Sequence, residues 1–546
     1  MELMQLLNER VQVGLRQSSI RKVSEWACEY RVMGGTFPGK WSHKNYPWLV
    51  GIQDCEAEHV VNQKAAQMGV TEAAMNLTFS EIDLFGGSVL YVLPSSKPDA
   101  SDFSSARFDP ALEMSDHLNN LFSETKNVNH KRAGNANLYI RGSRSKSQLK
   151  SVPVSKIILD ELDEMNQENL AMIPERMSGQ LRKQEFDLST PTISGYGISE
   201  RFENSTQNFF AFNCPHCSRL IRFLPEMLVI TADDFNDPKI RDSYYKCNRC
   251  DMKLPQETKA DYLASGVWVP EYTNRLIEGF HISQLYSLTV KPYHLAMMVV
   301  QSESDALIEQ ELYNSKFGLP NDQADARISL AQIKECIGEH TKRDIPLNSQ
   351  TMVTMGVDVG KKLHVQINEW YVNVNRSTDI NIASIPRVVK EITVKEFHEL
   401  DVFMQDFNVN FCVVDANPET RLAKAFCERF QNRAARCWYG NNIKGKDVNY
   451  NAENVSVTVD RTSWLDQSMG RFKRGTKGII LPQDASAEYI KHMQEPIRLL
   501  RLDRDGNPTA TYINKNADHF AHANNYAEIA LCLGASFGVN QNIRSM

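Results

Sequence analysis

Short apolar runs alternate with helix-like stretches between about residues 58 and 192, and this alternation constrains the fold more than any other feature. The runs include HVVNQ, GSVLYVLP, NLYIRG and SKIILDE, and a helical pattern covers Glu72 to Asp83. Such alternation is typical of a parallel sheet whose faces are covered by helices. We therefore predict a mostly parallel α/β domain. A second α/β region begins with TMVTMGVDVG and ends in the helical stretch DHFAHANNYAEIALCLGA.

The length and charge of the chain set further limits. Its 546 residues exceed what one hydrophobic core usually serves. A net charge of −6 excludes a uniformly basic nucleic-acid binder, although local basic patches remain. No apolar segment approaches membrane-spanning length, so we expect a cytosolic protein with no membrane partner.

The segment KAAQMGVT (64–71) has the frame of a phosphate-binding loop (P-loop), G-x-x-x-x-G-K-[ST]. Gly69 and Thr71 match the frame, whereas Lys64 replaces the first glycine and Val70 replaces the usual lysine. Because the segment follows an apolar run and precedes a helix, its N–H groups would face an anion. Lys64 has a stem long enough to turn its ammonium toward the phosphates of ATP. A tight turn without a ligand remains the alternative. The predicted nucleotide-binding residues of the loop are Lys64, Ala65, Ala66, Gln67, Met68, Gly69, Val70 and Thr71.

The run VSKIILDELDEM ends in Asp160 and Glu161. In a phosphate-loop ATPase this placement lets Asp160 hold Mg²⁺ together with the Thr71 hydroxyl, while Glu161 polarises the attacking water. The alternative is a strand that leads into an acidic helix N-terminus.

Two further segments have weaker signals for the same site. In FDLSTPT, Ser189, Thr190 and Pro191 are placed to sense a γ-phosphate, although a plain turn explains them equally well. Tyr46 and Trp48 could stack on adenine, and packing is the default role of such aromatic residues.

Four of the eleven cysteines form a regular pair of knuckles, CPHC and CNRC. Two CxxC turns supply a tetrahedral set of four thiolates that suits a structural Zn²⁺. Redox pairs and unrelated buried thiols are the alternatives, and His216 lies inside the first knuckle without being a predicted ligand. The predicted zinc ligands are Cys214, Cys217, Cys247 and Cys250.

Two strand-end carboxylates and one helix-start carboxylate form a second set. Asp358 ends TMVTMGVD, Asp415 ends NFCVVD, and Asp518 opens DHFAHA together with His519 and His522. An RNase H-like nuclease uses such carboxylates to hold two Mg²⁺ or Mn²⁺ ions about 4 Å apart across a scissile phosphate. Each aspartate also has a plain interpretation as a turn residue or helix cap.

A basic stretch lies upstream of that helix. Asp460 and Arg461 precede a cationic cluster that would follow a phosphate backbone without reading sequence. A solvated basic face is the equally weighted alternative. The cluster consists of Arg471, Lys473, Arg474 and Lys477.

Together these motifs resemble the large terminase subunits of tailed phages, in particular the lambda-like GpA class. The resemblance runs in order along nearly the whole chain, through KAAQMGVTE, LYIRGSRSKSQLKSVPVSKIILDELDEM, LSTPT, GFHISQLYSL and FGLP. One departure concerns DHFAHA, where His522 stands at a position that is often acidic in these proteins. Either Asp518 supplies the third carboxylate, or His519 and His522 contribute metal ligation or proton transfer.

The resemblance implies an ATP-driven motor that moves double-stranded viral DNA into a procapsid and cuts it endonucleolytically. It implies a small terminase subunit, a portal and a homo-oligomeric ring as partners, with a monomer in isolation as the alternative state, all in the host-cell cytoplasm. The rival interpretations are another kind of helicase or translocase with a nuclease domain, and a DNA-binding structural component that does not hydrolyse ATP. The predicted domains are an N-terminal helical segment (1–45), a P-loop ATPase core (46–208), a zinc-ribbon insert (209–254), the rest of the ATPase domain with a linker (255–350) and an RNase H-like nuclease domain (351–546).

Overall fold

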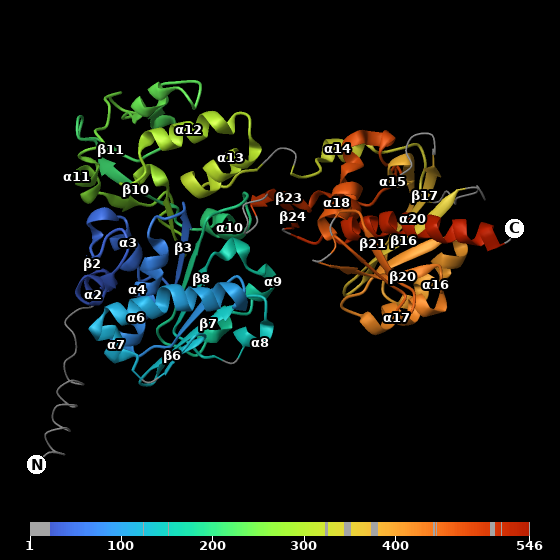
Figure 1. Ribbon diagram of the computed structural model, residues 1–546, viewed down its shortest axis with the longest axis horizontal. Coiled ribbons are helices and arrows are strands. Elements are labelled where there is room, and N and C mark those ends of the chain that lie inside the picture. Colours follow the sequence, from blue (N-terminus) through green and yellow to red (C-terminus); the bar gives the residue numbers. More distant parts are fainter. Residues whose placement is uncertain are drawn as a thin grey trace, which may run out of the picture. The chain divides into compact units, whose positions relative to one another are not determined.

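The chain divides into two compact units, Met1–Asp322 and Gln323–Met546, each with its own sheet and core. A computed structural model (Figure 1) describes residues 22–123, 125–150, 152–322, 326–342, 351–372, 380–440, 443, 445–502, 508–514 and 516–544. Within those ranges, no helix has the length and apolar character needed to cross a lipid bilayer.

The first unit is built on an eleven-stranded sheet in the order β11-β10-β15-β3-β9-β8-β4-β7-β6-β5, with β14 paired to β10. All strands from β10 to β7 in this order are parallel, which confirms the predicted mostly parallel α/β domain. The strands are β3 (His59–Lys64), β4 (Val89–Leu93), β5 (Thr125–Asn127), β6 (His130–Ala133), β7 (Ala136–Gly142), β8 (Lys156–Asp160), β9 (Gln184–Ser189), β10 (Asn208–Asn213), β11 (Leu220–Ile221), β14 (Val267–Val269) and β15 (Glu278–Ile282).

Both faces of this sheet are buried. In β4, Val89 and Tyr91 face the core that contains helix α4, while Leu90 and Val92 face a second apolar cluster. Successive strand residues point to opposite faces, so an apolar run is what a doubly covered strand requires. The helices of the unit are α2 (Val23–Tyr30), α3 (Leu49–Gln53), α4 (Val70–Phe85), α5 (Ser101–Phe103), α6 (Asp109–Met114), α7 (Asp116–Leu121), α8 (Lys146–Leu149), α9 (Gln167–Leu170), α10 (Gly197–Glu203), α11 (Lys259–Ala264), α12 (Pro292–Ser302) and α13 (Ala306–Glu311).

The predicted N-terminal helical segment is only partly helical where it is described. Residues 1–21 lie outside the described ranges, and α2 follows them. The chain then forms a short hairpin from β1 (Val32–Met33) and β2 (Gly39–Lys40). Gly35, at φ 73°, adopts a left-handed conformation that a continuing helix does not tolerate.

The cysteine-bearing insert begins later than the predicted residue 209. Strand β10 pairs with β15 in the main sheet, because its apolar residues are buried there, and β14 returns to pair with β10. The insert therefore projects from the end of β10. It contains β11, β12 (Leu228–Val229) and β13 (Tyr244–Tyr245).

The second unit has a seven-stranded sheet in the order β18-β17-β16-β19-β20-β22-β21. The pairs β18-β17, β17-β16 and β22-β21 are antiparallel, whereas β16, β19, β20 and β22 are parallel neighbours. The strands are β16 (Met352–Val359), β17 (Leu363–Val372), β18 (Ser384–Val394), β19 (Phe411–Asp415), β20 (Ala434–Tyr439), β21 (Val448–Asn451) and β22 (Ser456–Val459).

Helices cover both faces of this sheet as well. Residues Cys412 and Val414 of β19 pack with α16 (Phe397–Asp406) and α17 (Thr420–Arg429), whereas Phe411 and Val413 pack with α20 (His519–Arg544). Helix α20 lies against β16 at Gly356, where an added Cβ would stand 2.0 Å from the Ala523 carbonyl oxygen. Only glycine permits this approach.

The chain passes from one unit to the other earlier than the predicted residue 350. Helix α14 (Leu330–Glu335) buries Ile333 in a cluster of the second unit, next to α18 (Arg461–Gly470) and α19 (Ala487–Gln494). Residues 343–350 lie outside the described ranges. The remaining elements of the second unit are α15 (Ile380–Ala383) and the hairpin strands β23 (Ile497–Leu502) and β24 (Pro508–Ile513).

Candidate functional site

The segment 65–69 joins the end of β3 to the start of α4. Gln67 and Gly69 both have positive φ, 58° and 82°, so the backbone turns sharply before the helix begins. The loop is anchored by N–H groups of Ala65 and Ala66, which donate to the carbonyls of Ile282 and Ser315. A strand, a tight turn and a helix N-terminus thus stand in the arrangement that binds phosphate groups.

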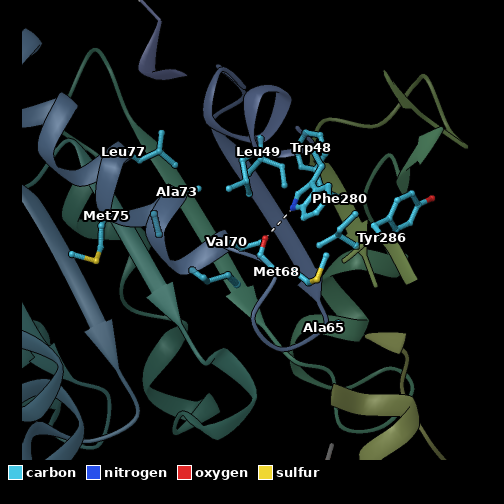
Figure 2. Packing of buried hydrophobic residues seen from close by; sticks show 14 of the residues in the cluster. Trp48, Leu49, Ala65, Met68, Val70, Ala73, Met75, Leu77, Phe280 and Tyr286 are labelled. Atoms are coloured by element: carbon cyan, nitrogen blue, oxygen red, sulfur yellow. Dashed lines mark hydrogen bonds between the residues drawn. The ribbon is translucent and has the colours of Figure 1, made fainter. Parts of the chain in front are cut away.

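Hydrophobic packing explains why this loop has no lysine at its penultimate position (Figure 2). Val70 is 1% exposed and lies in the core with Met68 and Ala65. Trp48 is also buried, and its Nε1 atom donates to the Met68 carbonyl at 2.9 Å. Trp48 is therefore a packing residue and is not available to stack on a base.

Lys64, the last residue of β3, forms an ion pair with the acidic residue that follows β8. Its Nζ atom lies 3.1 Å from Oε1 of Glu161. Burial disfavours the Lys64 charge, but the carboxylates of Glu161, Asp160 and Asp163 outweigh it and raise the Lys64 pKa. The ammonium is therefore charged, buried at 5% exposure and directed at the acidic pair.

Asp160 lies at the buried end of β8, two strands from β3. Tyr91 donates its hydroxyl to Oδ2 of Asp160 at 2.6 Å, while Oδ1 is buried and has no hydrogen-bond partner. Burial, followed by the charge of Glu161, raises the Asp160 pKa to about 7. An unpartnered buried carboxylate oxygen fits a site for hydrated Mg²⁺, which prefers oxygen ligands.

The residues after β9 contact the same acidic segment. Thr190 directs its hydroxyl at Oε2 of Glu161 over 3.4 Å, and Ser189 accepts the N–H of Asp163 at 3.2 Å. Asp163 in turn accepts hydrogen bonds from Thr192 and from the N–H of Ile198, at the start of α10. The ends of β8 and β9 are thus joined by hydrogen bonds to a helix.

A cavity of about 1050 Å³ opens over the loop and is bordered by Lys64, Thr71, Tyr46 and Glu161. Tyr46 is half-buried on its wall, in edge-to-face contact with Phe37. Such a volume accommodates a nucleotide.

Sequence reasoning did not single out Arg107, which also borders this cavity. Its Nη2 atom lies 2.6 Å from Oε1 of Glu72, in the first turn of α4. No local motif marks this arginine, because it is brought to the loop by a chain segment after β4.

The two cysteine knuckles have matching backbone geometry. In each, the N–H of the fifth residue, Ser218 or Asp251, donates to the carbonyl of the first cysteine at 2.9 Å, and that residue has φ 56°. The four sulfur atoms lie within 4.8 Å of one another, and those of Cys214 and Cys250 are 4.0 Å apart. Sulfur atoms around one Zn²⁺ at ~2.3 Å lie about 3.8 Å apart, so the geometry fits zinc. The ring nitrogen Nε2 of His216 contacts the Lys253 carbonyl instead.

In the second unit, strand register brings two of the predicted carboxylates together. Val357 of β16 pairs with Val414 of the parallel strand β19, so Asp358 and Asp415 end adjacent strands on the face covered by α20. Burial, and to a lesser extent the charge of Asp358, raise the Asp415 pKa to about 6.

Helix α20 contributes His519 to Asp358. Nδ1 of His519 lies 2.9 Å from Oδ2 of Asp358. The Asp518 carboxylate instead lies 3.4 Å from Nε2 of His522, whose Nδ1 is 3.0 Å from the Tyr439 hydroxyl. Burial acts against the Asp518 charge, but His522 outweighs it and lowers the Asp518 pKa.

Two histidines that sequence reasoning did not select complete this cluster. His364 of β17 is the direct cross-strand partner of Asp358, and its ring stacks on His519 with centroids 4.4 Å apart. His492 of α19 lies beside both, 5.5 Å from His364. Burial, then the charge of His519, lower the His364 pKa to about 4, so this imidazole is neutral at physiological pH. Strand pairing would have been needed to find it.

The predicted basic cluster is divided by burial. Arg471 is 1% exposed and pairs with Glu528 at 2.6 Å, so it is a core residue and does not reach a DNA backbone. Lys473, Arg474 and Lys477 are exposed. Arg471 also donates to the carbonyls of Ser384 and Asn381.

A phosphate loop after a central parallel strand, faced by an acidic pair two strands away, defines a phosphate-loop nucleotide-binding protein. Residues 35–268 match the family model described as "Phage terminase large subunit gpA, ATPase domain". The chain belongs to the large terminase subunit family.

No curated protein matches the chain. Among solved structures, it is similar to the full-length large terminase of a thermophilic bacteriophage, with 10% identity, a TM-score of 0.29, and coverage of 89% of this chain and 98% of that one. The large terminase ATPase domain of Thermus phage P74-26 matches with 14% identity and a TM-score of 0.31, over 49% and 92%. The large terminase nuclease of thermophilic phage G20c matches with 10% identity and a TM-score of 0.23, over 37% and 97%.

Proposed function

We propose that this protein hydrolyses ATP to move double-stranded viral DNA into a procapsid, and cuts that DNA at a separate site. The observation that carries the motor function is the 3.1 Å contact between Nζ of Lys64 and Oε1 of Glu161 across the loop. It supports a hydrolytic site because a phosphate-binding cation and a carboxylate base stand on the same cavity.

The roles of the residues follow from their positions. Lys64 contacts the phosphates of ATP from the first position of the loop, and Tyr46 contacts the base. Glu161 accepts a proton from the attacking water, which its 39% exposed side chain can reach. Asp160 and Thr71 would hold Mg²⁺, which neutralises phosphate charge when bound.

A route for coupling leaves the same site. Thr190 contacts Glu161, and Asp163 links Ser189 to the start of α10. In this proposal, a change at the γ-phosphate alters these hydrogen bonds and shifts α10, so Ser189, Thr190 and Pro191 couple hydrolysis to DNA movement.

ATP turnover by the purified chain with and without DNA tests the motor. We expect a weak ATPase that DNA and a portal-bound ring stimulate, and that Glu161→Ala abolishes. Turnover that Glu161→Ala leaves unchanged would refute this site. Binding of ATP without turnover would favour the rival interpretation of a structural DNA-binding component, and strand separation would favour a helicase.

The nuclease proposal rests on the second sheet. Its order β18-β17-β16-β19-β20, with three antiparallel strands followed by parallel ones, supports an RNase H-like fold. Asp358 and Asp415 end neighbouring strands, and Asp518 begins α20. These carboxylates would hold Mg²⁺ or Mn²⁺, which activates water and steadies the leaving oxygen when bound.

Plasmid cleavage in Mg²⁺ and in Mn²⁺ tests this assignment. Asp358→Asn should abolish cleavage in both metals, whereas ATP turnover should persist. The matched control is Asp401→Asn, because Asp401 pairs with Arg429 on the face that α16 and α17 cover. Cleavage that survives Asp358→Asn would remove this site from the proposal.

The remaining proposals concern metal and partners. The four thiols would hold a structural Zn²⁺, since they leave no open ligand position. A small terminase subunit, a portal and a homo-oligomeric ring in the host-cell cytoplasm are proposed from family membership. Co-sedimentation of the purified chain with portal rings tests the last of these.

A further inference from the structure

The nuclease centre contains an imidazole-rich set of donors next to its carboxylates. One ligand atom each from Asp358, His364 and His519 lies within 4.8 Å of the other two. We infer that these three side chains hold a divalent transition metal, with two imidazole nitrogens as ligands. This metal position rests on the proposed nuclease function, because Asp358 serves both.

The set is assembled by the fold. Asp358 and His364 are directly opposite each other on antiparallel strands, where Cβ atoms are about 5 Å apart and side chains share one face. Gly356, two residues earlier on that face, lets α20 approach so closely that its first residue, His519, reaches Asp358. Three elements distant in sequence therefore converge on one point.

Two observations indicate a ligand at this point. Nδ1 of His364 is buried and has no hydrogen-bond partner, in a side chain that is 7% exposed. A buried polar atom of this kind usually has a partner, which an ion would supply. In addition, Oδ2 of Asp358 and Nδ1 of His519 are 2.9 Å apart. Two ligand atoms at right angles around a metal at ~2.1 Å would be about 3.0 Å apart.

The donor types select the class of metal. Imidazole suits zinc, iron, nickel and copper, whereas Mg²⁺ prefers oxygen atoms and water. Three protein ligands leave positions open for water or a phosphate oxygen, as catalytic sites require. We therefore expect Mn²⁺ and later first-row metals to bind here more tightly than Mg²⁺.

Electron paramagnetic resonance of the full chain with Mn²⁺ tests this assignment. Mn²⁺ is the probe because it is paramagnetic and binds thiolates poorly, so the cysteine knuckles do not compete. Pulsed measurements on the wild-type protein should detect coupling of bound Mn²⁺ to imidazole nitrogen. Bound Mn²⁺ without nitrogen coupling overturns the inference, and this result needs no variant to fold.

Variants then identify the nitrogen atoms. His364→Ala and His519→Ala should each reduce the coupling and weaken Mn²⁺ binding at least about tenfold, since loss of even an outer-shell partner costs that much. His492→Asn is the matched control, because His492 belongs to the same cluster but its Nδ1 accepts the N–H of Phe520. Coupling that survives loss of both His364 and His519 overturns the inference.

The outcomes separate this inference from the nuclease proposal. Cleavage that depends on Asp358 but shows no nitrogen coupling would leave the nuclease standing and remove the imidazole ligands. Nitrogen-coupled Mn²⁺ without DNA cleavage under any condition would retain the metal position and refute the nuclease.

Discussion

Nζ of Lys64 and Oε1 of Glu161 lie 3.1 Å apart, although 97 residues separate them in sequence. One ends β3 and the other follows β8, and β9 lies between those strands. The lysine that a phosphate loop needs thus enters from the strand side, while the usual position, Val70, is buried in the core.

Loss of Lys64 should abolish ATP turnover. We expect Lys64→Ala to lower kcat at least about 10²-fold, because it removes the preorganised cation at the phosphates. Val70→Ala should keep turnover while lowering the free energy of unfolding by about 2 kcal/mol, since it removes buried methyl groups. Steady-state kinetics and denaturant unfolding measure the two effects. The reverse pattern, with turnover lost only in Val70→Ala, would contradict this placement of the cation.

Glu161 should show a conflict between stability and activity. Its φ of 61° is unfavourable for glutamate, with a cost of about 1–3 kcal/mol, and Asn tolerates this conformation better. Glu161→Asn should therefore raise the free energy of unfolding by about 1 kcal/mol while lowering kcat by about 10²-fold or more. Glu161→Gln is the control, since it removes the base and keeps the strain. Equal stability of the two variants would argue against stored strain.

Asp160 should make stability fall as pH rises. Burial raises its folded-state pKa to about 7 from 3.8, so between those values the folded state binds more protons than the unfolded state. Stability is therefore fully present below about pH 4 and is lost as pH approaches 7. Asp160→Asn should remove this loss, so the difference in Tm between variant and wild type should grow from pH 4 to pH 7. A difference independent of pH would show that Asp160 is charged throughout.

Removal of one thiol should release zinc. Cys250→Ser should lower the zinc content by one ion per chain and lower the Tm, because a structural metal contributes its binding free energy to folding. The exposed Cys28 offers a control, and Cys28→Ser should leave zinc content and Tm unchanged. Elemental analysis with thermal unfolding measures both. Full zinc content in Cys250→Ser would exclude the four-thiolate site.

The buried pair of Arg471 and Glu528 should dominate the stability of the second unit. Glu528→Gln leaves the Arg471 charge without its partner, so we expect a loss of about 3–5 kcal/mol. Lys473→Gln, on the same segment but exposed, should cost less than about 0.5 kcal/mol. Urea unfolding provides the comparison. A small effect of Glu528→Gln would place Arg471 back among the surface cations.

Local patterns carried much of the prediction. Apolar runs located β3, β4, β8 and β16, because a strand buried on both faces needs such a run. Cysteine spacing marked the four thiols that converge, since each knuckle is a local turn. Domain boundaries were less predictable: β10 reads as part of the insert, yet pairing with β15 assigns it to the main sheet.

The sequence by itself determined the strand-loop-helix around Lys64, the acidic end of β8 and the two knuckles, because short-range spacing and hydrophobic periodicity produce these features. Only the tertiary structure decided that His364 faces Asp358, that His519 and not Asp518 contacts it, and that Arg471 is buried. These outcomes depend on strand register and on the close packing of α20 against Gly356, and such long-range pairings have no signature in local sequence.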